Sequence, residues 1–357
     1  MLNFTVGPVM SSEDVLEVAS HSTPYFRTPE FSKIMQENEK LMLQFLNAPE
    51  KSRCVFLTTS GTGAMESCVM NVLNSKDKVL VINGGSFGQR FVELCCLHNL
   101  QMEEIKVDFG CQITKEQLIK YENRGYTALL VNMHETSSGV LYDMELIAEF
   151  CKKNHILLIV DAISAFLADK LDMNALGAAV VITGSQKALA VQPGISIVAL
   201  SVDALERIEE NTEKCMYLSL KAALKNGERG QTPFTPAVTT LLQIHRRLNG
   251  ILESGGVNQE RNHIKEIASN FRNQIKELPF SFVAESMSNA VTALYTKKKN
   301  AQEIIRILKE EYQIWVCPNG GNMADSVFRI GHIGYITKED NNALIAAFMD
   351  MNRKGLL

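Results

Sequence analysis

The sequence predicts an α/β protein with a mainly parallel sheet that is covered by helices on both faces. Three observations lead to this prediction. Between residues 50 and 200, short apolar runs typical of buried strands alternate with stretches whose apolar residues recur at helical spacing. Such alternation favours a parallel sheet buried on both faces. Several of the runs end directly in Gly, Ser, Asn or Asp, and open α/β sheets collect active-site groups at these strand ends.

The composition is that of a soluble globular protein. The chain has 357 residues, of which 46% are hydrophobic and 21% charged, which is enough for more than one core. A net charge of −4 provides no basic field, so we expect neither nucleic acid nor an anionic membrane as a partner. The first residues do not resemble a signal peptide, and no apolar run reaches the roughly 18 residues of a membrane helix.

Cysteine and histidine usage predicts a metal-free protein of a reducing compartment. The 8 cysteines show no CxxC or zinc-finger spacing, and the 7 histidines show no HExxH arrangement. Most of the cysteines fall on apolar faces, where a reduced cysteine packs as a small hydrophobic residue. We therefore expect a cytoplasmic location and no bound metal.

The N-terminal part contains an extended arm, a helix and a possible phosphate site. Residues 1–30 are punctuated by Gly and Pro and should be mostly extended, whereas residues 30–46 have helical spacing. A strand at 54–57 then leads through a glycine-rich turn into a helix at 65–73. Strand, glycine turn and helix N-terminus together can hold a phosphate on backbone N–H groups. A tight turn capped by Ser or Thr is the alternative.

The next units continue the alternation. A strand at 78–82 ends in a glycine-rich stretch that contains Phe87, and glycines there let the backbone approach a ligand. Further strands and helices are predicted at 91–97, 102–107, 114–121, 128–131 and 145–153.

Two charged residues at neighbouring strand ends indicate the chemistry. The strand at 178–182 runs into a small-residue turn that contains Lys187, and the strand at 156–160 ends in Asp161. A lysine among Gly, Ser, Ala and Leu should be desolvated, which lowers its pKa and makes the amine available as a Schiff-base nucleophile. Pyridoxal phosphate needs such a lysine, together with an acid that pairs with its pyridinium nitrogen.

The rest of the chain should complete the large domain and form a smaller one. A strand at 196–200, a helical stretch at 203–226, a proline-rich loop at 230–236 and a helix at 238–254 precede the glycines at 255–256. Helices at 259–278, 301–312 and 338–352 and strands at 290–295, 314–317 and 327–330 follow. We predict an N-terminal arm (1–14), a large domain (15–255) and a small C-terminal domain (256–357).

Seven motifs give the chain a resemblance to a known family. They are SGTGAME (60–66), GGSFGQR (84–90), HETSSGV (134–140), VDAI (160–163), GSQK (184–187), TPFTP (232–236) and FRIG (328–331). The motifs occur in the same order as in the class V aminotransferases of the alanine–glyoxylate and serine–pyruvate group, and the chain therefore resembles this family. The resemblance implies the fold type I architecture, which has a large domain with a mainly parallel seven-stranded sheet and a smaller α+β C-terminal domain.

The resemblance also implies the cofactor and its ligands. Pyridoxal 5'-phosphate would be held by Ser60, Gly61, Thr62, Phe87, Ser137, Asp161, Ile163, Gln186, Lys187, Thr232 and Thr235. Lys187 and Asp161 are the expected catalytic residues, and His134 would be a structural hydrogen bonder. Phe87, where relatives commonly have Trp, would stack on the ring or simply be a buried Phe.

Assembly and substrate contacts follow from the same resemblance. The protein would be a homodimer in which Thr235, or else Thr232, bonds the phosphate in the partner's site, with a capped helix start as the alternative. The arm would cross to the partner and bring Gly7, Tyr25 and Arg27 near substrate, unless it is a plain surface arm.

Arg329 is the expected substrate-binding residue of the small domain. It lies in an apolar strand, where a charge is costly unless it is paired. A planar guanidinium suits bidentate binding of a carboxylate, and the resemblance assigns that role to this motif. The alternative is an intramolecular ion pair.

We therefore expect a ping-pong aminotransferase that moves an amino group from an alanine- or serine-type donor to glyoxylate or pyruvate. A 2-aminoethylphosphonate–pyruvate transaminase is an alternative, since Arg329 requires only an anion. A cysteine desulfurase or related lyase using Cys317, and a binding protein that has lost catalysis, are further alternatives.

Overall fold

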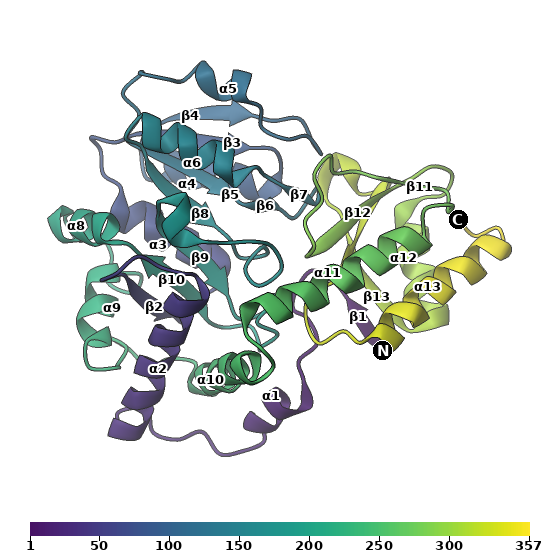
Figure 1. The fold of residues 1–357 in the computed structure, drawn as a ribbon, viewed down its shortest axis with the longest axis horizontal. Coiled ribbons are helices and arrows are strands. Elements are labelled where there is room, and N and C mark those ends of the chain that lie inside the picture. Colours follow the sequence, from purple (N-terminus) through teal and green to yellow (C-terminus); the bar gives the residue numbers. More distant parts are fainter.

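The computed structural model describes residues 1–357 and shows two large sheets, each with its own helices, and a two-stranded sheet of β6 and β7 (Figure 1). The larger sheet lies on the left of Figure 1 and the smaller one on the right, with α11 (Val257–Gln274) reaching from one to the other. No helix is both long and apolar enough to cross a membrane.

The large sheet has seven strands in the order β2-β10-β9-β8-β5-β3-β4. Their bounds are β2 Arg53–Leu57, β3 Lys78–Asn83, β4 Gln101–Lys106, β5 Ala128–Asn132, β8 Leu157–Asp161, β9 Ala178–Gly184 and β10 Ser196–Leu200. Only β10 runs against its neighbours β2 and β9. The prediction of a mainly parallel seven-stranded sheet is therefore confirmed.

Successive strand residues pack against opposite helical layers. Leu129 and Val131 belong to one apolar cluster, whereas Ala128 and Leu130 belong to another. The first cluster includes residues of α2 Pro29–Phe45, α6 Met144–Lys153, α7 Met173–Leu176 and α10 Val238–Glu253. The second includes residues of α3 Gly61–Val72, α4 Ser86–Leu97, α8 Val202–Glu210 and α9 Leu220–Gly227. Both faces of the sheet are thus covered.

The small sheet has five strands in the order β1-β13-β14-β12-β11. Its elements are β1 Leu2–Phe4, β11 Phe280–Phe282, β12 Val291–Thr296, α12 Ala301–Tyr312, β13 Ile314–Pro318, η1 Gly321–Met323, β14 Val327–Gly331 and α13 Lys338–Arg353. The N-terminal β1 runs parallel to β13, pairing Leu2 with Ile314. Both termini therefore lie on the small-domain side (Figure 1).

Three boundaries differ from the sequence-based expectation. The helix expected at 91–97 begins at Ser86, because the glycine-rich stretch before it forms the first turn of α4. The stretch at 203–226 is two helices, α8 and α9. The arm contains β1 and α1 (Glu13–Val18), which buries Val15, so residues 1–30 are less extended than expected. The short elements α5 (Lys115–Ile119), β6 (His134–Glu135) and β7 (Val140–Leu141) complete the chain.

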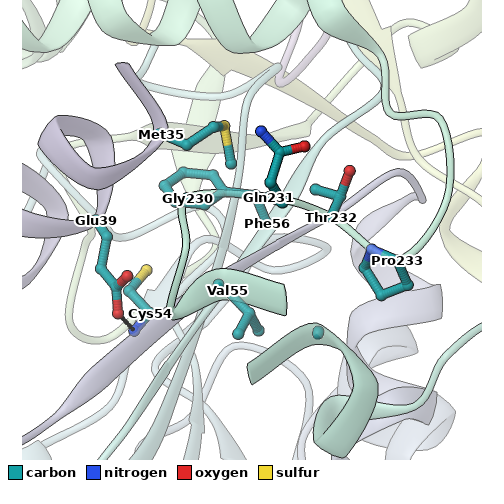
Figure 2. A pocket seen from close by; sticks show the side chains of 11 residues that line it. Met35, Glu39, Cys54, Val55, Phe56, Gly230, Gln231, Thr232 and Pro233 are labelled. Atoms are coloured by element: carbon teal, nitrogen blue, oxygen red, sulfur yellow. Dashed lines mark hydrogen bonds between the residues drawn. The ribbon is translucent and has the colours of Figure 1, made fainter. Parts of the chain in front are cut away.

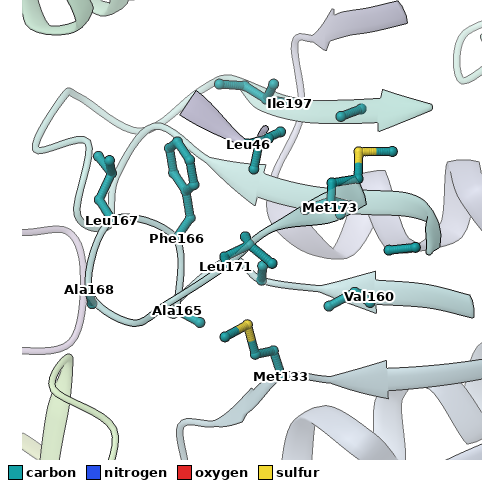
Figure 3. Packing of buried hydrophobic residues seen from close by; sticks show 14 of the residues in the cluster. Leu46, Met133, Val160, Ala165, Phe166, Leu167, Ala168, Leu171, Met173 and Ile197 are labelled. Carbon is teal, nitrogen blue, oxygen red and sulfur yellow. The ribbon is translucent and has the colours of Figure 1, made fainter. Parts of the chain in front are cut away.

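The segment after Asp161 is packed into the core. Ala165, Phe166, Leu167 and Ala168 are all buried and lie among side chains of the neighbouring strands (Figure 3). Leu167 has a φ of 65°. This conformation is unfavourable for a non-glycine residue and persists only where the surrounding structure holds it. This segment therefore forms a rigid support beneath the sheet edge where Asp161 lies.

Candidate active site

Four strands of the large sheet end at one edge. Asn132 pairs with Asp161, and Asp161 pairs with Ile182 in the parallel part of the sheet. Gly184 and Leu57 both pair with Ser196 of β10. The turn that bears Lys187 and the glycine-rich turn after β2 therefore leave the sheet on the same side as Asp161.

Asp161 is a buried carboxyl group with two partners. It is 5% exposed. One oxygen accepts a hydrogen bond from the Ile163 N–H at 2.8 Å, and the other accepts one from the Asn132 amide at 2.5 Å. Burial raises its pKa to about 6, although both hydrogen bonds act in the opposite direction. A cationic ring nitrogen beside it would restore the ionised form. Asn132, which the sequence analysis did not select, orients this carboxyl group.

Lys187 has the lowered pKa expected for a nucleophilic lysine. Its side chain keeps some accessible surface, but its amine is largely surrounded by protein. Burial, followed by the positive charge of Arg329, lowers the pKa of the amine to about 8. The amine donates a hydrogen bond to the Val6 carbonyl at 2.5 Å. A lowered pKa gives Lys187 a much larger neutral fraction near pH 7 to 8 than an ordinary lysine has.

The N-terminal arm lies over Lys187 of its own chain. Gly7 has a φ of 121°, and a Cβ on it would lie 2.7 Å from Lys187 Cδ. The resemblance placed this arm at the partner's site, whereas the structure puts Gly7 at the site of its own subunit. Tyr25 is 68% exposed, and its ring lies against Phe26. Arg27 instead donates to the Thr232 and Pro233 carbonyls at 2.8 and 3.1 Å.

The N-terminus of α3 has the features of a phosphate cradle. Ser60 caps the helix by accepting from the Gly63 N–H at 3.4 Å, and the N–H groups of Gly61 and Thr62 have no partner within the helix. A Cβ on Gly61 would lie 2.4 Å from Ile163 Cδ1, so any other residue here would require the Ile163 side chain to move. The backbone N–H groups of this turn can therefore bind an anion by donating hydrogen bonds to it.

Phe87 and Ser137 are joined by a carboxylate that the sequence analysis overlooked. Glu135 is buried and accepts hydrogen bonds from the N–H groups of Phe87 and Gly88 at 3.2 and 3.0 Å. The Ser137 hydroxyl also donates to Glu135, at 2.5 Å. Phe87 itself is half-buried, with the Arg90 guanidinium 4.9 Å from its ring centroid. Its ring is thus not an ordinary core residue.

His134 does not act as expected. Its ring is buried, neither ring nitrogen has a hydrogen-bond partner, and burial lowers its pKa to about 3. Only its backbone carbonyl is bonded, accepting from the Ser164 hydroxyl at 3.5 Å. The ring therefore does not make the structural hydrogen bond that we predicted. The bond to Ser164 is made by the backbone carbonyl of His134 instead.

The proline-rich loop presents its two threonines differently. Thr232 is buried, and its hydroxyl donates to the Phe234 carbonyl at 2.8 Å. Thr235 is exposed on the surface, on the same loop that Arg27 holds through its carbonyls. Gln186 is half-buried and immediately precedes Lys187. A small cavity of about 20 Å³ separates the loop from β2 and α2 (Figure 2).

Arg329 has no carboxylate partner. Its guanidinium donates to the carbonyls of Thr136 and Pro318 at 3.2 and 2.6 Å and to Cys317 Sγ at 3.2 Å, while its Nε has no partner. The alternative of an intramolecular ion pair is therefore wrong. Arg329 is close enough to Lys187 for its positive charge to lower the pKa of that amine. Strand β14 of the small sheet thus brings a positive charge without an acid partner near Lys187.

Cys317 lies beside Arg329 but on a strand. It pairs with Arg329 across β13 and β14, and all eight cysteines are free. No group of three or more His, Cys, Asp or Glu is arranged to hold a metal ion.

These residues fit pyridoxal phosphate. The α3 turn offers N–H donors for a phosphate, Asp161 offers an acid for a ring nitrogen, and Lys187 offers a partly neutral amine. Fold and site together define an enzyme of the pyridoxal phosphate type.

Comparison with known proteins identifies the family. The profile described as aminotransferase class-V matches residues 14–344, so the chain belongs to the class V aminotransferase family. A protein of Anabaena cylindrica named soluble hydrogenase 42 kDa subunit is 30% identical, over 93% of this chain and 88% of its own. The serine–glyoxylate aminotransferase of Arabidopsis thaliana is 26% identical, over 94% of this chain and 86% of its own.

A solved structure agrees with this assignment. The aspartate aminotransferase of subgroup IV from Thermus thermophilus superposes with a TM-score of 0.92 and 25% identity, covering 99% of both chains. The chain is therefore a pyridoxal phosphate-dependent aminotransferase of fold type I.

Proposed function

We propose that the enzyme transfers an amino group from a small amino acid of the alanine or serine type to glyoxylate or pyruvate. The observation that carries this proposal is Arg329, a guanidinium that bonds only carbonyls and a thiol, has no acid partner, and is close enough to Lys187 for its charge to lower the pKa of that amine. A guanidinium in that state is a receptor for the carboxylate of a substrate.

Each residue of the site has a role in this proposal. When bound, pyridoxal phosphate supplies an electrophilic aldehyde and an electron-withdrawing ring. The N–H groups at the start of α3, with Ser60 and Thr62, would hold its phosphate, and Phe87 would cover one face of the ring. Ser137 and Gln186 would lie at its edge, and Ile163 packs against Gly61. Asp161 in its ionised form holds a proton on the ring nitrogen.

Lys187 carries the proton transfers. Its neutral amine is the base for the proton on the donor's Cα, since a lowered pKa leaves the amine able to accept a proton near neutral pH. Arg329 fixes the donor's carboxylate while this proton moves. The acceptor oxo acid, which also has a carboxylate, uses the same arginine in the second half of a ping-pong cycle.

Relatives support glyoxylate as an acceptor but differ in the donor. One relative is named for serine and glyoxylate and the superposed structure for aspartate. Arg329 would hold the α-carboxylate of any of these donors, and would also accept a phosphonate.

Donor screening combined with an Arg329 variant tests the proposal. Alanine, serine, aspartate and 2-aminoethylphosphonate are offered with glyoxylate or pyruvate, and kcat/KM is measured for each pair. We expect alanine or serine with glyoxylate to be best. Arg329→Gln should raise the KM of both carboxylate substrates, while the variant keeps the absorbance of bound cofactor. An unchanged KM would refute the role of Arg329, and preference for the phosphonate would change the substrate class.

We further propose a homodimer with shared sites. Thr235 lies on a surface with Met216 (77% exposed), Tyr217 (55% exposed) and Phe234, whose ring stacks on Tyr217 at 5.6 Å between centroids. An exposed apolar patch of this kind is typical of an interface. Arg27 anchors the same loop, so Tyr25 and Arg27 would approach the partner's site together with Thr235.

The remaining assignments are proposals of the same kind. The break between α10 and α11 at Gly255 and Gly256 supports a large domain of residues 15–255 and a small one of 256–357, with the arm 1–14 contributing β1 to the small sheet. Eight free cysteines favour the cytoplasm. Cys317 is held on β13 by Arg329 rather than on a mobile loop, which disfavours a desulfurase.

A further inference from the structure

A buried carboxylate of the large domain is bound by the small domain. Asp169 lies eight residues after Asp161 in the packed segment below the sheet edge and is 3% exposed. It accepts hydrogen bonds from the Ser288 hydroxyl at 2.5 Å and from the Asn289 N–H at 2.9 Å. Ser288 and Asn289 come just before β12 of the small sheet. This contact therefore joins the two domains.

The small-domain side of the contact continues to the strand that carries Arg329. Arg272 of α11 donates to the carbonyls of Ser288 and Val291 and, at 2.8 Å, to the Thr292 hydroxyl. That hydroxyl is hydrogen-bonded to His332 Nε2 at 2.7 Å, and His332 directly follows β14. Ala293 of β12 pairs with Arg329 of β14. Asp169 is thus linked through buried polar groups to one end of the strand pair that bears Arg329, where β12 begins and β14 ends.

Burial is energetically unfavourable for both charged members of this network, Asp169 and Arg272. Burial raises the pKa of the Asp169 carboxyl and lowers the pKa of Arg272 to about 10, and Asp169 is the charge that opposes the effect on Arg272. Burying a charge is unfavourable unless hydrogen bonds and an opposite charge compensate. The segment that directly precedes Asp169 is held in place, because Ala165, Phe166 and Leu167 are packed in the core (Figure 3).

We propose that the Asp169–Ser288 contact is a domain clamp, in which Asp169 is a positioning residue that sets where Arg329 stands relative to Lys187. The inference rests on the proposed function, in which Arg329 binds the substrate carboxylate. Lys187 belongs to the large domain and Arg329 to the small one. An amino acid carries its amine and its carboxylate on the same carbon, so it reaches both residues only within a narrow range of domain positions, and a misplacement of about 1 Å is costly.

The clamp predicts a particular kinetic effect. If the small domain occupies the competent position only part of the time, the apparent dissociation constant of the substrate rises by the reciprocal of that fraction. The cofactor contacts lie in the large domain and are unaffected. Once substrate bridges the two residues, the chemical step proceeds as before. Loss of the clamp should therefore raise KM and leave kcat and cofactor binding nearly unchanged.

The experiment compares variants of the holoenzyme. In Asp169→Ala, KM for donor and acceptor should rise by about tenfold or more, because a hydrogen bond to a charged group corresponds to at least one order of magnitude in affinity. Ser288→Ala, which removes one donor, should give a smaller rise in the same direction. Lys170→Ala is the matched control, since Lys170 is adjacent to Asp169 but pairs with Glu145 on the exposed surface, and it should behave as wild type.

A double variant distinguishes a clamp from a general loss of structure. If Asp169 acts through Arg329, adding Asp169→Ala to Arg329→Gln should produce little further rise in KM. Unchanged KM in both Asp169→Ala and Ser288→Ala, with a raised KM in Arg329→Gln, would overturn the clamp and leave the proposed function intact. An unaffected Arg329→Gln would overturn the proposed function and the clamp with it. If Asp169→Ala does not fold, the KM of Ser288→Ala decides.

Discussion

The edge of the large sheet and the surface that bears Thr235 are built in opposite ways. At the sheet edge, the carboxylates of Asp161 and Glu135 are buried, and donors of the same chain satisfy them. On the surface, Thr235 is exposed beside the stacked rings of Tyr217 and Phe234. The comparison teaches that one chain supplies the reactive groups with their hydrogen bonds already made, whereas the loop that is proposed to bind phosphate leaves Thr235 exposed.

The strongest way to test the sheet edge is to remove its nucleophile. Lys187→Ala should abolish transamination and covalent attachment of the cofactor, because no other amine lies at the end of β9. Absorbance spectra after dialysis and a coupled assay measure both effects. Lys187→Arg, which keeps a positive charge but cannot act as a base near neutral pH, should be equally inactive. Wild-type turnover in either variant would disprove the assignment of this edge.

Asp161→Asn should have the second largest effect. The amide cannot hold a proton on the ring nitrogen, and a hydrogen bond to a charged group contributes on the order of 1.5–3 kcal/mol, so kcat should fall by about 100-fold. The variant should still bind the cofactor, which fluorescence titration measures. Asn132→Ala, which removes only one hydrogen bond to Asp161, should show a smaller loss. Equal losses in the two variants would contradict a charge-specific role.

Mixing two damaged chains tests the surface half of the comparison. A Lys187→Ala chain and a Thr235→Ala chain should form heterodimers with one intact site, so activity should recover to about a quarter of wild type if the chains mix at random. Thr239→Ala is the control, because its hydroxyl bonds only Thr23 nearby. Sizing should show a dimer. A fully active monomer, or no recovery despite proven subunit exchange, would rule out shared sites.

The smallest expected effect concerns the pH at which the cofactor is incorporated. The pKa of Lys187 is lowered from its usual value to about 8, so the neutral amine and the rate of reaction with pyridoxal phosphate should increase as the pH rises through about 8. Arg329→Gln removes a positive charge that lowers this pKa, so its profile should move to higher pH. Arg306→Gln, which removes an exposed charge paired with Glu310, should not move it. A shift to lower pH in Arg329→Gln would contradict the proximity of the two cations.

The groups that follow a strand directly could be predicted from the sequence. Lys187 and Asp161 end up at one edge because parallel strands bring their carboxyl ends together, and strand periodicity is a local signal. Glu135 was missed because its role depends on reaching N–H groups of α4 nearly fifty residues away. Its only local signal was an acid beside the serine and threonine of the HETSSG motif.

The arm shows a second limit of local reasoning. Gly7 was expected near a substrate, yet its position over Lys187 of the same chain depends on β1 pairing with β13, more than three hundred residues later. Pattern analysis also could not show that Arg329 has no acid partner. Periodicity shows that Arg329 lies in an apolar strand, but only the structure shows that its guanidinium is bonded to carbonyls and a thiol.

The pairing of β1 with β13 has a consequence for biosynthesis. Residues 2–4 leave the ribosome long before residues 314–318 exist, so the first strand has to wait for almost the entire chain before it finds its neighbour. Until then, the Val6 carbonyl cannot be held over the Lys187 amine, and the large domain can complete its own core first. Docking of the arm is therefore a late step in maturation, and the nascent enzyme carries an uncovered lysine from the synthesis of Lys187 until β13 has been made.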